Sequence, residues 1–225
     1  MRINKECLSY EDVLLVPQYS DIISRKEVSL QSNLGTHTFE LPIISSPMDT
    51  VTEVAMANSM GLAGGLGIIH RYCSVNDQAS MVRDINTGTK AAAIGVTGDY
   101  HERALALVAM GAEVLCIDVA HGHHILVKNA ITQLRDTFGS TVHIMAGNVA
   151  TLQGINDLAR WGADSVRCNI GGGSICSTRI QTGHGLPGLH TIFECAKTEH
   201  DVAIIADGGI RTSGDAVKAL AAGAD

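Results

Sequence analysis

The stretch GGGSICSTR, which surrounds Cys176, combines residue types that could perform nucleophilic chemistry. Three glycines precede the cysteine and allow a loop to approach a ligand closely. Backbone N–H groups of such a loop can turn toward an anion, and Ser174 adds a hydroxyl. Arg179 and Arg167 flank the loop, and positive neighbours lower the pKa of a thiol. We therefore expect Cys176 to be a nucleophile rather than a buried structural thiol, with Thr178 placed to pass a proton.

A second stretch, IIADGGIRTSGD, carries groups suited to a sugar and a phosphate. Asp207 can accept hydrogen bonds from ribose hydroxyls, and Gly208 and Gly209 offer N–H groups to a phosphate. The alternative for this stretch is a simple turn between a strand and a helix. Further polar residues follow other apolar runs, among them Ser46 in SSPMDT and Asn148 in AGNVAT.

The stretch IDVAHGHH ends in one aspartate and three histidines, namely Asp118, His121, His123 and His124. A metal site is conceivable here, but the spacing lacks a clear third-ligand pattern, so we disfavour it. The stretch GLAGGLG does not match G-x-G-x-x-G, and no acidic residue follows it at the spacing of a dinucleotide-binding unit. A dinucleotide would therefore bind across loops rather than on such a unit.

The elements that position these residues form one repeated pattern. Seven times, a short apolar run ends in Gly, Asp, Asn or Ser, and an amphipathic stretch follows. Near-continuous apolar runs are typical of parallel strands buried on both faces. Cap signals mark helix starts at Ser74 and at Thr212, and glycines mark helix ends at Gly61, Gly111, Gly162 and Gly223.

Two fold classes accommodate seven such units: a doubly wound sheet and a (β/α)8 barrel. Polar and glycine-rich residues follow nearly every strand, whereas a doubly wound sheet concentrates them at one switch point. The sequence therefore predicts a single (β/α)8 TIM-barrel catalytic domain over residues 1–225. Since a barrel needs eight strands, we expect the eighth strand and the C-terminal part to be missing from the given chain, whose last residues, AAGAD, resemble the lead-in to that strand.

Composition excludes several classes of protein. The net charge of −7 argues against a nucleic-acid-binding surface, and 4% aromatic residues disfavour base-stacking platforms. None of the six cysteines forms a C-x-x-C pair, and their scatter through apolar runs indicates reduced thiols and a cytoplasmic location. The N-terminal residues lack an apolar signal core, and no apolar run is long enough to span a membrane.

Taken together, the quoted stretches resemble the family of inosine-5′-monophosphate (IMP) dehydrogenase and GMP reductase. The resemblance rests on YEDVLLVPQYSDI, SSPMDTVTE, GGLGIIHRYCSVNDQASMVR, IDVAHGH, AGNVAT, GGGSICSTRIQTGHGLP and IIADGGIRTSGDAVKALAAGAD, which span nearly the whole chain. It implies a cytoplasmic homotetrameric oxidoreductase of purine and GMP biosynthesis that uses NAD, with a potassium ion as a second cofactor.

The resemblance also implies roles for individual residues. Cys176 matches the nucleophile that attacks purine C2, and Thr178 the threonine beside it. The other matches are nucleotide-contacting residues (Ser46, Met48, Arg167, Ser174, Asp207, Gly208 and Gly209), cofactor-site residues (Asp118 and Asn148) and potassium-binding carbonyls (Gly171, Gly173 and Cys176).

The wording AHGH, GNVAT and IIADGGIR favours the dehydrogenase, which converts IMP to XMP. The reductase, which uses NADPH to convert GMP to IMP, is the alternative, because no pair of regulatory CBS modules interrupts RDINTGTKAAAIGV. A nucleotide-binding fragment without activity is a third hypothesis. The sequence departs from the family wording at three positions: Asn169 replaces a usual Gly, Gly172 a common Pro, and His184 a usual Val.

Overall fold

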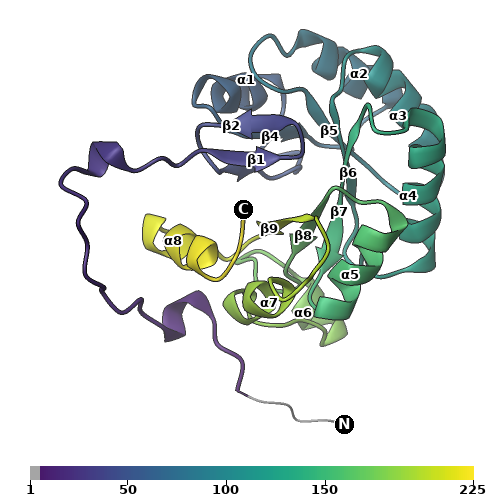
Figure 1. Cartoon of the computed structure of the whole chain (residues 1–225). Coiled ribbons are helices and arrows are strands. Elements are labelled where there is room, and N and C mark those ends of the chain that lie inside the picture. Colours follow the sequence, from purple (N-terminus) through teal and green to yellow (C-terminus); the bar gives the residue numbers. More distant parts are fainter. Residues whose placement is uncertain (1–5) are drawn as a thin grey trace.

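A computed structural model describes residues 6–225 as a curved, seven-stranded parallel sheet with helices along its outer face (Figure 1). Neighbouring strands in the sheet are consecutive in the chain, which confirms the barrel arrangement, because a doubly wound sheet reverses its strand order. The strands are β3 (Ile44–Ser45), β4 (Leu66–Ile69), β5 (Ala91–Ile94), β6 (Val114–Asp118), β7 (His143–Val149), β8 (Ser165–Cys168) and β9 (Ala203–Ala206).

The helices that follow these strands are α1 (Val54–Leu62), α2 (Val75–Asp84), α3 (Tyr100–Ala109), α4 (Ile125–Phe138), α5 (Leu152–Trp161), α6 (Thr178–Thr182), α7 (Gly188–Cys195) and α8 (Ser213–Ala221). Only six residues separate α2 from β5. The longest helix, α4, has 14 residues, and no described helix combines the length and apolar character that a bilayer crossing requires.

Local capping explains several helix boundaries. The hydroxyl of Ser74 accepts a hydrogen bond from the Asp77 amide at the start of α2, as the sequence predicted. Gly162 ends α5 in the left-handed conformation, also as predicted. The prediction that Gly61 ends its helix was wrong. Gly61 lies inside the last turn of α1, and the glycine with positive φ after this helix is Gly64, at 80°.

Alternation along the strands divides the apolar side chains into two layers. Within β5, for example, Ala92 and Ile94 face the helices, whereas Ala91 and Ala93 face the inside of the curve. The inner layer consists of Leu34, Phe39, Leu66, Ile68, Ala91, Ala93, Val114, Cys116 and Met145.

A short antiparallel hairpin, β1 (Ser32–Leu34) and β2 (His37–Phe39), was not predicted. Its turn uses Gly35 at φ 59°, a conformation that suits glycine. Leu34 and Phe39 pack into the inner layer, beside residues that begin β4, β5 and β6. The hairpin therefore covers the amino-terminal end of the barrel, opposite the polar residues.

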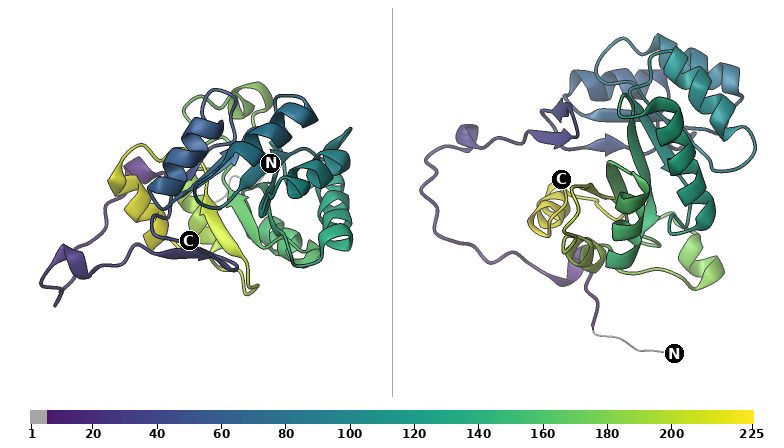
Figure 2. Two further views of the ribbon diagram at one scale, coloured as in Figure 1. Left: turned by 90° about the horizontal axis from the view of Figure 1, so that it is seen from above. Right: turned by 45° about the vertical axis from the view of Figure 1, so that its right-hand side comes forward.

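The chain before the hairpin forms a long arm outside the barrel (Figure 2). It includes two 3-10 turns, η1 (Tyr10–Asp12) and η2 (Arg25–Glu27). The Nζ of Lys218 on α8 donates to the Tyr10 carbonyl (2.7 Å) and anchors the start of the arm. Beyond this anchor large apolar side chains are exposed, with Tyr19 and Ile23 each 94% accessible.

The strands β3 and β9 form the two edges of the described sheet, and each pairs on one side only. A largely apolar cavity of about 500 Å³ opens between them, with Phe39, Ile44 and Ile205 in its wall. The interruption of the barrel therefore lies where an eighth strand would pair.

A closed pair of hydrogen bonds recurs at the amino-terminal ends of the strands. In each pair, an acidic residue donates its amide to a carbonyl at or next to the start of a strand and accepts that residue's amide on its own carboxylate. Glu113 and Asp164 directly precede β6 and β8, and Asp225 is the last residue of the chain. The pairs are Glu113 with Lys90, Asp164 with Ile144, and Asp225 with Ile204.

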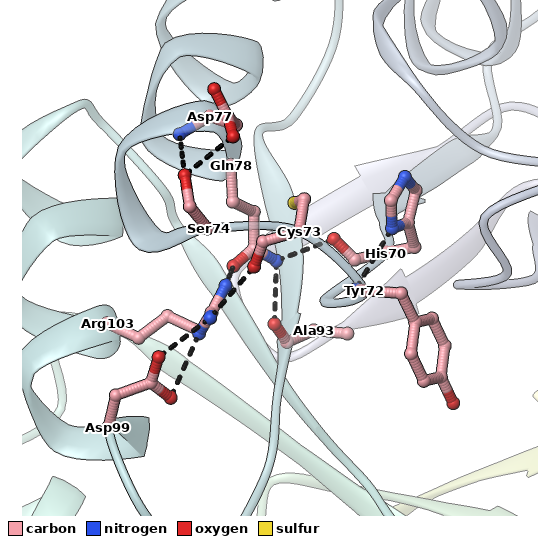
Figure 3. A network of polar contacts seen from close by, with 9 residues as sticks. All are labelled: His70, Tyr72, Cys73, Ser74, Asp77, Gln78, Ala93, Asp99 and Arg103. Atoms are coloured by element: carbon pink, nitrogen blue, oxygen red, sulfur yellow. Dashed lines mark hydrogen bonds and ion pairs between the residues drawn. The ribbon is translucent and has the colours of Figure 1, made fainter.

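A buried polar network ties the loops after β4 and β5 to α2 and α3 (Figure 3). Arg103 donates to Gln78 Oε1 (2.8 Å), to the Cys73 carbonyl (3.0 Å) and to both carboxylate oxygens of Asp99. The amide of Gln78 in turn donates to the carbonyls of His70 and Ala93. We call Cys73, Gln78, Asp99 and Arg103 the Arg103 network.

Candidate active site

Cys176 lies in the loop between β8 and α6, and its amide donates to the Gly173 carbonyl at 3.1 Å. The thiol is partly buried. A hydrogen bond from the Thr178 side chain lowers the pKa of this thiol below its usual value of 9.0, with further contributions from the amides of Thr178, Arg179 and Gly171. The predicted direction of the shift is therefore confirmed.

The predicted cause of that shift, the positive charge of the two arginines, was wrong: Arg179 contributes through its backbone amide, and Arg167 points into the barrel. Its guanidinium donates to Asp118 Oδ1 (2.6 Å) and to Asp207 Oδ2 (3.0 Å). Burial opposes the positive charge, but the carboxylate of Asp207 outweighs it, with help from Asp118, and raises the pKa of Arg167. Side chains alternate between the two faces of a sheet, and Arg167 lies on the inner face of β8, where these two carboxylates hold its guanidinium.

Asn148 completes this cluster from the end of β7. Its Nδ2 donates to Asp207 Oδ2 (2.5 Å) and to the Asn169 carbonyl (2.9 Å). Gly147 gives Arg167 room, because a Cβ at position 147 would lie 2.6 Å from the Cβ of Arg167. Four predicted site residues thus form one connected cluster, the Arg167 network: Asp118, Asn148, Arg167 and Asp207.

A second cavity, of about 610 Å³, lies beside this cluster, and its lining includes Ser174, Gly208, Gly209 and the two arginines Arg179 and Arg211. Gly208 and Gly209 adopt φ values of 77° and 76°, which favour glycine. A Cβ on Gly208 would come within 3.3 Å of the Gly173 Cα, so the turn after β9 lies directly against the loop of Cys176. Glycine amides and arginines suit a phosphate.

The wall of the 610 Å³ cavity includes Tyr10, which we assigned no role from the sequence. Its ring is buried, and a Cβ on Gly188 or on Gly209 would lie 3.0 Å or 4.0 Å from it. Burial, aided by the charges of Asp215 and Asp207, raises the pKa of Tyr10 to about 12. The motif YEDVLL contained this residue, but nothing in its spacing connects it with a turn almost 200 residues later.

Ser46 and Met48 lie in the turn after β3. Ser46 lines the apolar cavity together with Arg167 and Asp207, and its carbonyl accepts from the Met48 amide (2.8 Å) and from the Thr52 hydroxyl (2.7 Å). Met48 is partly buried but is not part of that cavity's lining. The structure therefore places Ser46 in the same cavity as Arg167 and Asp207, whereas Met48 lies outside that cavity's lining.

Other cysteines have the opposite chemistry. Burial raises the pKa of Cys116 to about 12. A hydrogen bond with Cys195, together with burial, raises the pKa of Cys168. Both thiols are therefore expected to stay protonated and unreactive.

Among the histidines after β6, His123 pairs through Nε2 with Asp157 Oδ2 at 2.7 Å and lies beside the Trp161 ring. His124 begins α4, where its Nδ1 accepts from the Leu126 amide at 3.1 Å.

Comparison with known proteins places these features in one family. The model of the IMP dehydrogenase / GMP reductase domain matches residues 7–225. The chain belongs to this family. It is 32% identical to inosine-5′-monophosphate dehydrogenase of Nitrosopumilus maritimus, over 98% of this chain and 73% of the relative. It is 36% identical to GMP reductase of Mycoplasma mycoides, over 96% of this chain and 68% of the relative.

A solved structure supports the same assignment. The crystal structure of inosine-5′-monophosphate dehydrogenase from Legionella pneumophila superimposes with a TM-score of 0.92 at 45% identity, covering 98% of this chain and 68% of that one. The Nitrosopumilus alignment extends over 351 positions, more than the 225 residues of this chain, so that relative contains residues without a counterpart here. The Mycoplasma reductase aligns over 221 positions.

Proposed function

We propose that the protein oxidises IMP to XMP with NAD through a covalent bond to Cys176. The observation that carries this proposal is the lowered pKa of the Cys176 thiol in a loop that contacts a glycine turn suited to phosphate. The wording AHGH and IIADGGIR, and the Legionella dehydrogenase at 45% identity, support the dehydrogenase reaction.

In the proposed reaction the Cys176 thiolate adds to C2 of IMP and makes that carbon tetrahedral. The C2 hydrogen then leaves with its electron pair as hydride, which NAD accepts when bound. Water adds to the resulting thioimidate, the S–C2 bond breaks, and XMP and the thiol are released. Thr178, whose side chain hydrogen-bonds the sulfur, holds the thiolate in place before attack.

In this proposal, residues that line the two cavities bind and orient the nucleotide. Phosphate is expected at Ser174, Gly208 and Gly209, and ribose hydroxyls at the carboxylate of Asp207. This carboxylate bonds to Arg167 and Asn148, so its position is fixed before the nucleotide arrives. Preorganised contacts of this kind reduce the entropy lost when the base meets the thiolate.

Asp118 and Asn148, the two residues expected to contact NAD, differ in how many polar atoms remain available to a ligand. Asp118 uses one carboxylate oxygen for Arg167, and a carboxylate has further lone pairs for a ribose hydroxyl. Asn148 has both of its amide hydrogens directed at Asp207 and at Asn169, so only its Oδ1 is available to a ligand. We therefore assign cofactor binding to Asp118 and a supporting role to Asn148.

Potassium is a further part of the proposal, with the carbonyls of Gly171, Gly173 and Cys176 as ligands. The Gly173 carbonyl already accepts the Cys176 amide, so its second lone pair would face the ion. Carbonyl oxygens suit a hard monovalent cation. A homotetramer in the cytoplasm remains the prediction for assembly and location, and light scattering would test the assembly.

GMP reduction is the second candidate. In this reaction the same thiolate displaces ammonia from C2 of GMP, hydride that NADPH would supply adds to C2, and the S–C2 bond breaks to release IMP. The short connection between α2 and β5 favours it, as does the Mycoplasma reductase, which aligns without a long insertion. A spectrophotometric assay separates the two reactions. We expect IMP and NAD to yield NADH, with stimulation by potassium; consumption of NADPH with GMP and release of ammonia would replace the proposal.

Alkylation tests the nucleophile independently of turnover. Iodoacetamide should modify Cys176 before the fully buried Cys116, Cys168 and Cys195, and IMP should slow this reaction. Peptide mass spectrometry identifies the modified residue. Cys176→Ala should abolish turnover and leave IMP affinity within about tenfold, or about 1.4 kcal/mol. Equal modification of all these cysteines in the native protein would contradict the assignment.

A further inference from the structure

Asn169, the residue after β8, has an unusual backbone conformation. Among the described residues it is the one non-glycine residue with positive φ, at 145°. Its amide donates to the Val149 carbonyl (2.9 Å), and its carbonyl accepts from Asn148 Nδ2 (2.9 Å). The surrounding chain therefore holds Asn169 in a conformation that side-chain-bearing residues rarely adopt.

Asn169 is buried, with 4% of the residue exposed, and its carboxamide joins two loops of the site. Its Nδ2 donates to the Asp207 carbonyl at 2.7 Å and to the Gly208 carbonyl at 3.3 Å. Its Oδ1 is buried and has no hydrogen-bond partner among the described residues. Since only the nitrogen makes bonds, the side chain acts here as a donor to the turn after β9.

Glycines surround this carboxamide. A Cβ on Gly172 would lie 2.1 Å from Asn169 Nδ2, far closer than any real contact, and a Cβ on Gly188 would lie 3.2 Å from it. Gly172 is itself part of the loop that leads to Cys176. The loop departs from the family wording at Asn169 and at Gly172, and the structure places these two residues in contact.

We propose that Asn169 is a positioning residue of the nucleotide site and that Gly172 is the residue that makes room for it. The carboxamide fixes the Asp207–Gly208 backbone, which carries the expected ribose and phosphate contacts, against the loop of Cys176. The inference rests on the proposed nucleotide site, but not on which nucleotide reaction the protein catalyses.

The first variant is Asn169→Gly. Glycine adopts φ 145° readily, so relief of the backbone strain offsets part of the stability lost with the two hydrogen bonds, and we expect the variant to fold. Loss of the two donated hydrogen bonds should raise the dissociation constant of IMP about tenfold. The pH profile of Cys176 alkylation should move toward that of an ordinary thiol, because the loop is no longer held. An unchanged dissociation constant and an unchanged profile would overturn the proposal.

The second variant is Gly172→Ala, alone and combined with Asn169→Gly. Alone, it should weaken IMP binding more than tenfold, because the new methyl group overlaps the carboxamide. In the double variant the methyl group has space, so affinity should return to that of Asn169→Gly. Gly214→Ala is the matched control, since a Cβ there meets only Thr212 Oγ1 at 3.6 Å, an ordinary contact.

Two results would contradict the coupling: a Gly172→Ala variant as mild as the control, or effects of the two substitutions that simply add. The same measurements with GMP and with inorganic phosphate separate this proposal from the proposed reaction. If IMP fails to bind the wild type while GMP or phosphate binds, the dehydrogenase proposal fails, and the coupling is measured with the ligand that binds.

Discussion

Two buried arginines near the carboxyl ends of the strands have different surroundings. Arg103 donates to two neutral acceptors, Gln78 and the Cys73 carbonyl, and to Asp99, whose side chain is 48% exposed. Arg167 lies between two largely buried carboxylates, Asp118 and Asp207, at the wall of a 500 Å³ cavity. The first network is complete within the protein. The second has one positive charge against two negative charges and opens toward ligand.

The largest expected effect is that of Arg167→Met, which removes the cation between two carboxylates. Loss of one partner of a buried ion pair costs about 3–5 kcal/mol, because the remaining charges are uncompensated. We expect the free energy of unfolding to fall by this amount and IMP binding to be lost. Urea unfolding and calorimetric titration measure the two effects. A loss below about 1 kcal/mol would mean that water replaces the guanidinium.

Arg103→Met is the matched substitution in the other network. It leaves the acceptors of Gln78 and Cys73 buried without a donor, whereas Asp99 can turn to water. Unsatisfied buried acceptors cost about 1–3 kcal/mol. The free energy of unfolding should fall by that amount, while kcat and KM of the folded protein stay unchanged. A change in KM for the nucleotide would show that the two networks are coupled.

Asp207→Asn sharpens the comparison, because the amide keeps the size of the side chain and removes one of two negative charges. A ribose hydroxyl loses a charge-assisted hydrogen bond, worth about 1.5–3 kcal/mol. We expect the dissociation constant of IMP to rise at least tenfold, with a smaller effect on unfolding because Arg167 still faces Asp118. Isothermal titration at constant pH gives the constant.

The smallest expected effect concerns pH and Asp99. The hydrogen bond from Arg103 holds the pKa of this carboxyl below its usual value of 3.8, although partial burial opposes the shift. A lowered pKa in the folded state contributes stability above pH 3.8, and this stability is lost as the pH falls below that value. The difference in unfolding free energy between wild type and Asp99→Asn should therefore narrow below pH 4. If the difference in unfolding free energy stayed constant with pH, the Arg103–Asp99 ion pair would not be its source.

The sequence predicted the seven sheet strands and the residues that follow them, because apolar runs and polar ends are local patterns. It did not predict the hairpin β1–β2, whose three-residue strands are too short for alternation to be visible. It identified Arg167 as a site residue but misjudged its partners, since the direction of a side chain depends on strand register. The contact between Asn169 and Gly172 was also invisible, because it depends on a backbone conformation that neither residue type specifies.

The paired hydrogen bonds at the strand starts have a consequence for how this fold tolerates change. Asp164 clamps the chain to Ile144, and Arg167 follows three residues later. The position of the Arg167 guanidinium along the barrel axis is therefore set by its distance in sequence from Asp164. It does not depend on the length of α5 or of the loop between α5 and Asp164. Residues inserted before Asp164, in the loop that follows α5, would enlarge the surface and leave the position of Arg167 unchanged. A single residue removed between Asp164 and Arg167 would turn the guanidinium from the inside of the barrel to the helices.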